Sequence, residues 1–511
     1  MNRFVSLACS AVVGCFALSG CAEKTSAPPV DQQKPSASNA ASTTTWEIYR
    51  LQGHRVGYGC TTTRRESEAG RPVVRTESVG HLAIQRGGET SRQDMRVMSV
   101  ETPEGTLLRF ESETRMGPEP MRIAGRVRGD RLDLEVLGPG AKMPKKTSIA
   151  WSPDFRGPFA GEQSMVRRPM QPGEHRMLKM LMPAMDTAEA ATLDMKAKTI
   201  EPTPLADGSR DLLRIETVTR MAGGPRIEGV AWCDRAGETM KNVTGGLETL
   251  RVSKDEAMKD AGSASFDLLS QMMVRVDPPL DSPRETTRVR YRVRLDGGDP
   301  SRVFAIGPSQ TVKRIDAHAA EITVDAIRPG RKDGNRNAPA DPPTKNDLRP
   351  NDFIQSDDPL IVANAKKAAG DEKDPWRVAK ALERFVHRDV KDKDFSQAFA
   401  TAAEVARTHE GDCTEHAVYL AALCRARGIP ARVAVGLVYL DGTQSFFYHL
   451  WTEAFIDGRW IPIDGTQAQG GIAADHLKIA DSGLTGASAY GVFLPVAEIV
   501  GRLKIDVVEA K

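Results

Sequence analysis

From Trp46 to about Arg251 the chain alternates between apolar and polar residues in short runs that are separated by turn residues. In the stretch RIAGRVRGDRLDLEV, apolar residues recur at every second position on either side of a Gly-Asp turn. A period of two is typical of strands in antiparallel hairpins that bury one face and expose the other. The pattern therefore predicts an antiparallel β-rich domain over residues 46–275.

A methionine-rich segment interrupts these strands between Pro172 and Met195. Its long apolar side chains are Met177, Leu178, Met180, Leu181, Met182 and Met185. A long curved antiparallel sheet with such a segment resembles the half-barrels of periplasmic lipoprotein-carrier proteins, which hold acyl chains. The alternative is that the segment only closes the open end of a β core, since methionine fills irregular gaps readily. No motif decides between the two.

The pattern changes twice after this domain. Residues 283–330 alternate again and predict a small β module, whereas 331–350 are rich in Gly, Pro, Asn and charged residues, as linkers are. From 351 to 511 helical patterns come first: Asp374 is a natural N-cap before Pro375, and the apolar residues that follow lie close to one helical face. They are Trp376, Ala379, Leu382 and Val386. The fold class that we predict is α+β.

The first residues predict the compartment. An uncharged apolar run follows Arg3 and ends in Leu-Ser-Gly before Cys21, which is the length of a signal peptide and not of a membrane span. These four residues resemble the bacterial lipobox, which implies a signal peptide over 1–20 and lipidation of Cys21. Ala22 favours the outer membrane, facing the periplasm, by analogy with Gram-negative sorting. Residues 21–45 have almost nothing to bury, so we expect a disordered tether.

The net charge bears on the kind of partner that the protein binds, and the cysteines bear on its disulfides. Lys plus Arg number 70 against 68 Asp plus Glu, which leaves a net charge of +2, and no basic run of the kind that nucleic acids bind is present. We therefore expect no nucleic-acid partner. Cys60 and Cys233 both fall in the strand-rich region of an exported chain, where we predict a disulfide; two separate buried thiols are the alternative.

Cys413 opens a helical stretch. In GDCTEHAVYLAALCRARGIPARVAVGLVYL, the residues from Cys413 to Arg427 have helical composition, and Gly428 with Pro430 ends the helix before a strand. The free N–H groups and the dipole at a helix N-terminus favour a thiolate and can stabilise an oxyanion. Cys424 is three turns further along the helix, so we interpret it as a core residue.

The next strands supply a base and an orienting carboxylate. His449, Trp451 and Glu453 alternate onto one face of the strand FYHLWTEAFI, and a turn at Asp457-Gly458 leads into a strand that ends at Asp464. A hairpin of this kind can bring Asp464 beside His449 and orient the imidazole. The order Cys, His, Asp is a nucleophile, a base and the group that orients the base.

At these residues the sequence resembles the transglutaminase-like superfamily, papain-related enzymes in which a helix-start cysteine attacks an amide. The resemblance covers about residues 355–490 and rests on GDCTEHA, ARGIPAR, the HxWxE pattern and IDGT, where Gly465 stands at a position that is Pro in many relatives. It implies Cys413, His449 and Asp464 as the catalytic residues. Neighbours of these residues in the motifs are expected to support them structurally: Asp412, Glu415, His416, Trp451 and Glu453.

The leading interpretation is an exported, lipid-anchored thiol enzyme that acts on amide bonds as a peptidase, amidase or transamidase. Its substrate would be a protein, a peptide or a peptidoglycan peptide, and the sequence does not choose among them. The alternative is a non-catalytic envelope scaffold whose β domains bind a lipid, peptide or protein. No cluster has zinc or calcium spacing, so we expect no metal and no cofactor.

Overall fold

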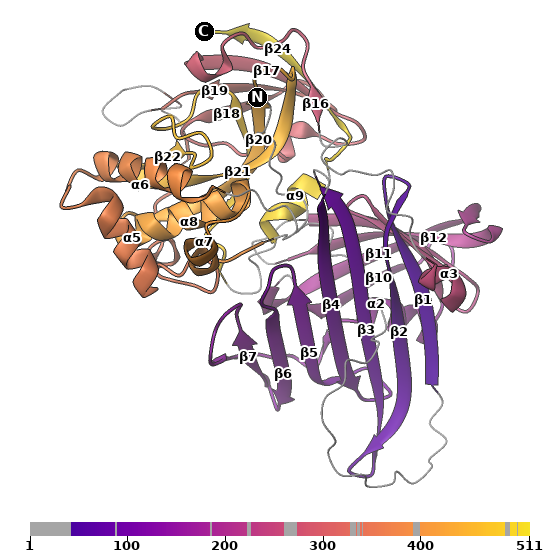
Figure 1. Ribbon diagram of the computed structural model, residues 1–511. Helices are drawn as coiled ribbons and strands as arrows, with labels where there is room; N and C mark the ends of the chain where they lie inside the picture. The colour runs from indigo at the N-terminus through magenta and orange to yellow at the C-terminus, as the bar shows by residue number, and fades with distance from the viewer. Residues whose placement is uncertain are drawn as a thin grey trace.

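The computed structural model describes residues 42–86, 89–183, 186–221, 226–259, 273–327, 334, 338–339, 341–391, 399–485, 491–497 and 499–511. These residues form three sheets, of 15, five and four strands, and a group of helices packed against the second sheet (Figure 1). The fold is α+β, as the sequence predicted.

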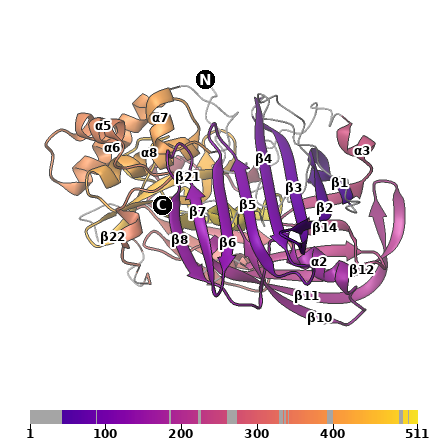
Figure 2. The same ribbon diagram turned by 90° about the horizontal axis from the view of Figure 1, so that it is seen from below.

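The first sheet follows the chain almost strand by strand. Its members are β1 (Ser42–Leu51), β2 (His54–Glu68), β3 (Arg71–Arg86), β4 (Glu89–Glu101), β5 (Leu107–Arg115), β6 (Met121–Arg128), β7 (Arg131–Leu137), β8 (Lys145–Ala150), β9 (Phe155–Arg156), β10 (His175–Met182), β11 (Asp186–Leu205), β12 (Gly208–Arg220), β13 (Arg226–Cys233), β14 (Thr239–Thr244) and β15 (Leu247–Val252). The order runs from β8 back to β1, then from β15 back to β9. Figures 1 and 2 show that the sheet curves strongly, because neighbouring strands twist relative to one another.

The methionine-rich segment contributes two strands to this sheet. β10 pairs with β11, and Leu181 is buried while Met177 is exposed. Met185 lies outside the described residues. Across the sheet, Met165 of the short helix α2 (Ala160–Arg167) packs with Met195 in a separate apolar cluster. The segment is therefore part of the β sheet itself.

The second sheet has the order β16 (Val274–Arg275), β21 (Ser445–Ile456), β20 (Ala431–Leu440) and β23 (His476–Ser482), with β22 (Arg459–Ile463) paired to β21. The third sheet has the order β18 (Gln310–Arg314), β19 (Ala319–Asp325), β17 (Arg288–Leu295) and β24 (Leu503–Ala510). The helices beside the second sheet are α5 (Pro359–Ala369), α6 (Pro375–Asp389), α7 (Ala402–Thr408) and α8 (Cys413–Ala426). Shorter helical segments are α3 (Lys254–Met258), α9 (Leu494–Ala497) and the 3₁₀ turns Pro283–Glu285, Pro300–Arg302 and Lys345–Asp347.

Two predicted boundaries do not match the sheets. Residues 274–275, assigned from the sequence to the first domain, pair with β21 in the second sheet. Residues 503–510, assigned to the C-terminal domain, pair with β17 in the small β module. Both differences have one reason, because alternation predicts a strand but not the neighbour with which it pairs.

The predicted disulfide between Cys60 and Cys233 is wrong. Cys233 has a free, buried thiol whose Sγ lies 3.7 Å from Met165 Sδ. The sheet order places β1, β15 and β14 between the two strands that carry these cysteines. Four strand spacings correspond to roughly 19 Å along the sheet. A disulfide needs Cα atoms within about 7 Å.

The predicted signal peptide, 1–20, and Cys21 lie outside the described residues. The tether predicted over 21–45 is too long by at least four residues, because β1 begins at Ser42. Thr44 pairs with Thr62 of β2, and their hydroxyls lie 3.1 Å apart. β-Branched threonines fit a strand that has a neighbour to pair with. Within the described residues, no helix has the length and apolar content to cross a membrane.

The curved sheet contacts the C-terminal region at its β5 to β8 end (Figure 2). Lys145 Nζ of β8 lies 2.7 Å from Asp352 Oδ1, and the Phe399 N–H donates to the carbonyl of Met116 at 3.2 Å. Ala400, the residue after Phe399, contacts the start of α8, as shown below. The first sheet therefore supports a segment next to the helix that carries Cys413.

We predict that Ile505→Ala destabilises the protein by about 2–5 kcal/mol, because it leaves a cavity between β24 and its neighbours. Ile505 is 2% exposed, lies opposite Val293 and also bridges to Val276. Urea unfolding followed by fluorescence measures the change. Lys504→Ala, an exposed neighbour on the same strand, should change the free energy of unfolding by no more than about 0.5 kcal/mol. Equal effects of the two variants would contradict the packing of β24 on this module.

Candidate active site

The start of α8 is fixed by a capping box. The Asp412 side chain accepts the Thr414 N–H at 2.7 Å and caps the third helical N–H, and Glu415 returns a bond to the Asp412 N–H at 2.9 Å. Gly411 precedes the cap with φ 146°, and a Cβ there would lie 2.3 Å from the Cβ of Glu415. These contacts place Cys413 as the first residue of the helix.

Glu415 and His416 have structural partners. Glu415 also accepts the Ala400 N–H at 2.9 Å, and burial together with the charge of Asp412 raises the pKa of Glu415 well above its usual value. His416 Nδ1 lies 2.6 Å from the carbonyl oxygen of Asp412. Both side chains therefore contact the loop and the helix start.

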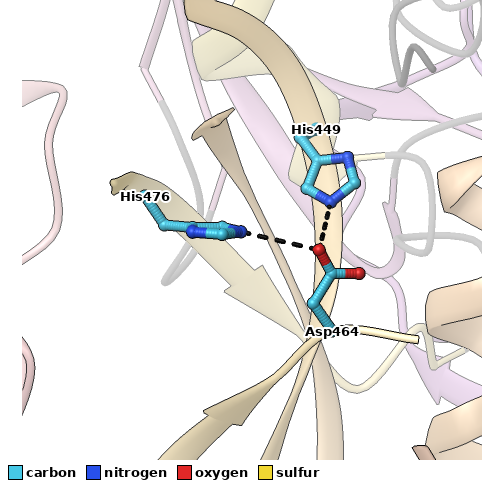
Figure 3. Close-up of side chains that lie close together, drawn as sticks. All are labelled: His449, Asp464 and His476. Atoms are coloured by element: carbon cyan, nitrogen blue, oxygen red, sulfur yellow. Dashed lines mark hydrogen bonds and ion pairs between the residues drawn. The ribbon is translucent and has the colours of Figure 1, made fainter. Parts of the chain in front are cut away.

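The hairpin of β21 and β22 brings His449 to Asp464. Ile456 pairs with Arg459 around the turn at Asp457 and Gly458, and Asp464 follows the last residue of β22. The distance from His449 Nε2 to Asp464 Oδ2 is 3.0 Å. In Figure 3 the other ring nitrogen of His449 points away from the carboxylate.

Cys413 lies on the other side of His449. It is near enough to His449 to raise the pKa of the imidazole, and its Sγ accepts the backbone N–H of Leu450, the next residue, at 3.4 Å. The structure thus brings together the three residues that the sequence singled out. All three side chains are buried, with exposures of 0% for Cys413, 3% for His449 and 1% for Asp464.

The charges in this group stabilise one another. Burial lowers the pKa of His449, but the charges of Asp464 and Cys413 and the hydrogen bonds to both raise it more, so the pKa is about 9. Burial acts to raise the pKa of Asp464, but the charge and hydrogen bond of His449, with weaker help from His476, hold this pKa well below its usual value. His449 is consequently an imidazolium, and Asp464 a carboxylate, at neutral pH.

The loop after β22 fixes the carboxylate of Asp464. Its Oδ1 accepts the Thr466 N–H at 2.8 Å and the Thr466 hydroxyl at 2.7 Å. Glu383 of α6 accepts the backbone N–H of Asp464 at 3.0 Å, and burial raises the pKa of Glu383 to about 7. Sequence reasoning missed both residues; Glu383 is 81 positions away from Asp464 and no motif marks it.

Glu453 joins three strands of the second sheet. It accepts from Arg432 Nε of β20 at 2.8 Å and from Lys478 Nζ of β23 at 2.7 Å. Asp481 lies 2.9 Å from Arg432 NH1 and 2.7 Å from Lys478 Nζ. Each buried charge in this group has a partner of opposite sign. Glu453 therefore holds the sheet together, at some distance from Cys413.

Cys424 is a core residue, as the sequence predicted. It is 0% exposed, and burial raises its pKa to about 12. A thiol of this kind is protonated and inert at neutral pH. It offers a control for the reactivity of Cys413.

His476 is a second histidine on Asp464 that sequence reasoning missed. Its Nε2 lies 3.6 Å from Asp464 Oδ2, and its Nδ1 lies 2.7 Å from Asp475 Oδ1 (Figure 3). An isolated histidine in a strand gave no signal, because most such residues are structural.

By distance alone His449, Asp464 and His476 could meet around one metal ion, since their ligand atoms lie within 4.8 Å of one another. The contacts that the structure shows among these three residues are a hydrogen bond of 3.0 Å between His449 and Asp464 and an ion pair of 3.6 Å between His476 and Asp464.

Gly436 of β20 makes room for this arrangement. It pairs with His449 on one side and Lys478 on the other. A Cβ at this position would lie 2.0 Å from the Leu477 carbonyl oxygen and 2.8 Å from the Trp451 ring. The absence of a side chain thus lets β23 and Trp451 approach β20 closely.

We predict that Gly436→Ala destabilises the protein by about 1–3 kcal/mol and disturbs His449, because β23 or Trp451 must move. Thermal unfolding, and the rate at which Cys413 is alkylated, would measure the two effects. Gly307→Ala is the control, since a Cβ there would meet nothing within 4 Å. A Gly436→Ala protein as stable and as reactive as this control would contradict the close approach.

The comparisons with known proteins agree with this geometry at the level of the family. Residues 363–465 match the family model of the transglutaminase-like superfamily. No curated protein sequence matches the chain.

Solved structures give only distant likenesses. A candidate cysteine protease from Cytophaga hutchinsonii is 17% identical over 43% of this chain and 82% of its own, with a TM-score of 0.26. The periplasmic domain of TgpA from Pseudomonas aeruginosa is 14% identical over 36% of this chain and 91% of its own, with a TM-score of 0.24. A β-barrel-like protein from Brucella abortus is 9% identical over 41% of this chain and 93% of its own, with a TM-score of 0.28. It is the match to the family model that places residues 363–465, which include Cys413, His449 and Asp464, in the transglutaminase-like superfamily.

Proposed function

We propose that this protein is a thiol enzyme that acts on amide bonds, with Cys413 as nucleophile, His449 as acid and base, and Asp464 as the residue that orients His449. The observation that carries the proposal is the row of contacts from the Cys413 side chain to His449 and from His449 Nε2 to Asp464, 3.0 Å apart. A thiolate paired with an imidazolium is the reactive form of such a site.

The reaction starts with attack of the Cys413 thiolate on the substrate carbonyl carbon, which moves the carbonyl electron pair onto oxygen. The positive end of the α8 dipole favours the negative charge of this oxyanion. The His449 imidazolium then gives its proton to the leaving amine as the C–N bond breaks, and a thioester on Cys413 remains. Neutral His449 next takes a proton from the incoming nucleophile, which attacks the thioester and releases the Cys413 thiolate beside the His449 imidazolium.

The nucleophile decides the class of the enzyme. Water gives a peptidase or amidase, and an amine gives a transamidase, and both use the same three residues. We propose a protein, a peptide or a peptidoglycan peptide as substrate. Since the three side chains are buried, the substrate reaches Cys413 only after the covering residues move.

We also propose that the protein is exported and anchored through a lipid on Cys21, at the outer membrane and facing the periplasm. The support is the lipobox-like sequence that ends at Cys21 and the polar stretch that follows it. Several acyl chains hold a protein firmly on a membrane where one would not.

Cys413→Ala should abolish covalent labelling of the native protein by a fluorescent iodoacetamide at pH 7, whereas Cys424→Ala should leave labelling unchanged. His449→Ala should slow labelling more than Asp464→Asn, because Asn keeps the shape of the orienting side chain while it loses the charge. Labelling is read by mass spectrometry of the modified peptide, and circular dichroism checks that each variant is folded. Labelling that persists in Cys413→Ala would favour the non-catalytic scaffold.

Cys21→Ser should release the protein from the membrane fraction or leave it as an unprocessed precursor, since the thiol that receives the lipid is gone. Fractionation followed by mass spectrometry of the mature amino end measures this. Cys15→Ser, an equal change inside the apolar run, should leave membrane attachment intact. An unmodified amino end at a residue other than Cys21 would contradict the anchor.

A further inference from the structure

Asp464 lies between two imidazoles. Its Oδ2 is 3.0 Å from His449 Nε2 and 3.6 Å from His476 Nε2, and Figure 3 shows the two rings approaching the same oxygen from different sides. The His476 side chain is 0% exposed. The carboxylate therefore has a second partner that the proposed reaction does not yet use.

The fold holds His476 rigidly. It is the first residue of β23 and lies opposite Val438 of β20. Its Nδ1 is held by Asp475 Oδ1 at 2.7 Å, and the carbonyl of Asp475 accepts the Tyr439 N–H at 2.9 Å. The Trp451 ring meets the His476 ring edge to face at 5.2 Å. Contacts from β20, which pairs with β23, and from Trp451 of β21 thus hold the His476 ring in place.

Charge alternates along this row. Burial lowers the pKa of His476, but the charge of Asp475, the hydrogen bond to Asp475 and the charge of Asp464 raise it more, so the pKa is about 9. The groups that face His476 are Asp475 from its own strand, Asp464 after β22, and His449 and Trp451 from β21, with ring centroids 5.9 Å from His449. A second cation at Asp464 weakens the hold of this carboxylate on the His449 proton.

We propose that His476 is a positioning residue for the Cys413 reaction: it holds Asp464 toward His449 and, through its charge, makes His449 a better proton donor to the leaving amine. The inference rests on the proposed function. A purely structural histidine would stabilise the strand without changing how His449 titrates. The titration of His449 is therefore the property to measure.

The experiment uses iodoacetate on the full-length protein, so it needs no knowledge of the substrate. The carboxylate of iodoacetate is attracted by the His449 imidazolium, so the rate of Cys413 alkylation should fall as the pH rises past the pKa of His449. The rate is measured from pH 5 to 10.5 for the wild type, His476→Gln and Asp475→Asn. Thermal unfolding is recorded for each variant at each pH.

In His476→Gln the amide can still donate to Asp464, but the charge is lost. The pH at which the rate of Cys413 alkylation falls should therefore rise by about 0.5–1 unit. Asp475→Asn removes the carboxylate that holds the proton on His476, so the pH at which the alkylation rate falls should move in the same direction. This variant replaces His476→Gln in the experiment if His476→Gln does not fold. An unchanged or downward shift in the folded variants would overturn the inference.

Two controls distinguish a positioning role of His476 from a metal site and from failure of the proposed function. Wild-type protein in EDTA should keep its profile; if EDTA shifted the profile as His476→Gln does, the residue would belong to a metal site and the positioning role would be overturned. If wild-type Cys413 is not alkylated at any pH, the proposed function itself fails. An identical profile in the wild type and in both folded variants defeats the role of His476 alone.

Discussion

The C-terminal region is arranged around one buried carboxylate, that of Asp464. A carboxylate that loses water needs cations and hydrogen-bond donors in its place, and without them it would take up a proton. Here Oδ2 meets His449, with His476 further away, and Oδ1 receives the hydroxyl and the N–H of Thr466. The conformation of the loop after β22 follows from this need.

The same need extends to neighbouring elements. The backbone N–H of Asp464 is held by Glu383 of α6, so a helix far away in the sequence sets the position of the loop. The start of α8 depends in turn on Glu415, which bonds to Asp412 and to Ala400. Because Phe399, beside Ala400, bonds to Met116 at the end of β5, the curved sheet also supports the helix that carries Cys413. Cys413 and the residues around it thus have supports from both halves of the chain.

Sequence patterns could predict what depends on neighbours along the chain. Alternation predicted the antiparallel sheets, and the helical composition from Cys413 with the stop at Gly428 and Pro430 predicted the helix that the structure shows as α8. The turn at Asp457 and Gly458 predicted the hairpin that brings His449 to Asp464. The predicted disulfide was wrong because the positions of two cysteines in the sequence do not give the number of strands that lie between them in the sheet.

His476 and Glu383 could not be predicted for a related reason, since each acts through tertiary contacts that join segments with no shared pattern. The need for such residues nevertheless follows from the pair that the sequence did identify. A chain that buries His449 and Asp464 side by side must also bury groups that compensate for what remains of their charge and their hydrogen bonding. His476 with Asp475, Thr466 and Glu383 are these groups, and Gly436 leaves the space in which β23 can bring the first pair close. The supporting residues are thus a consequence of burying the site, and a search for partners of a buried pair finds them once the strands are placed.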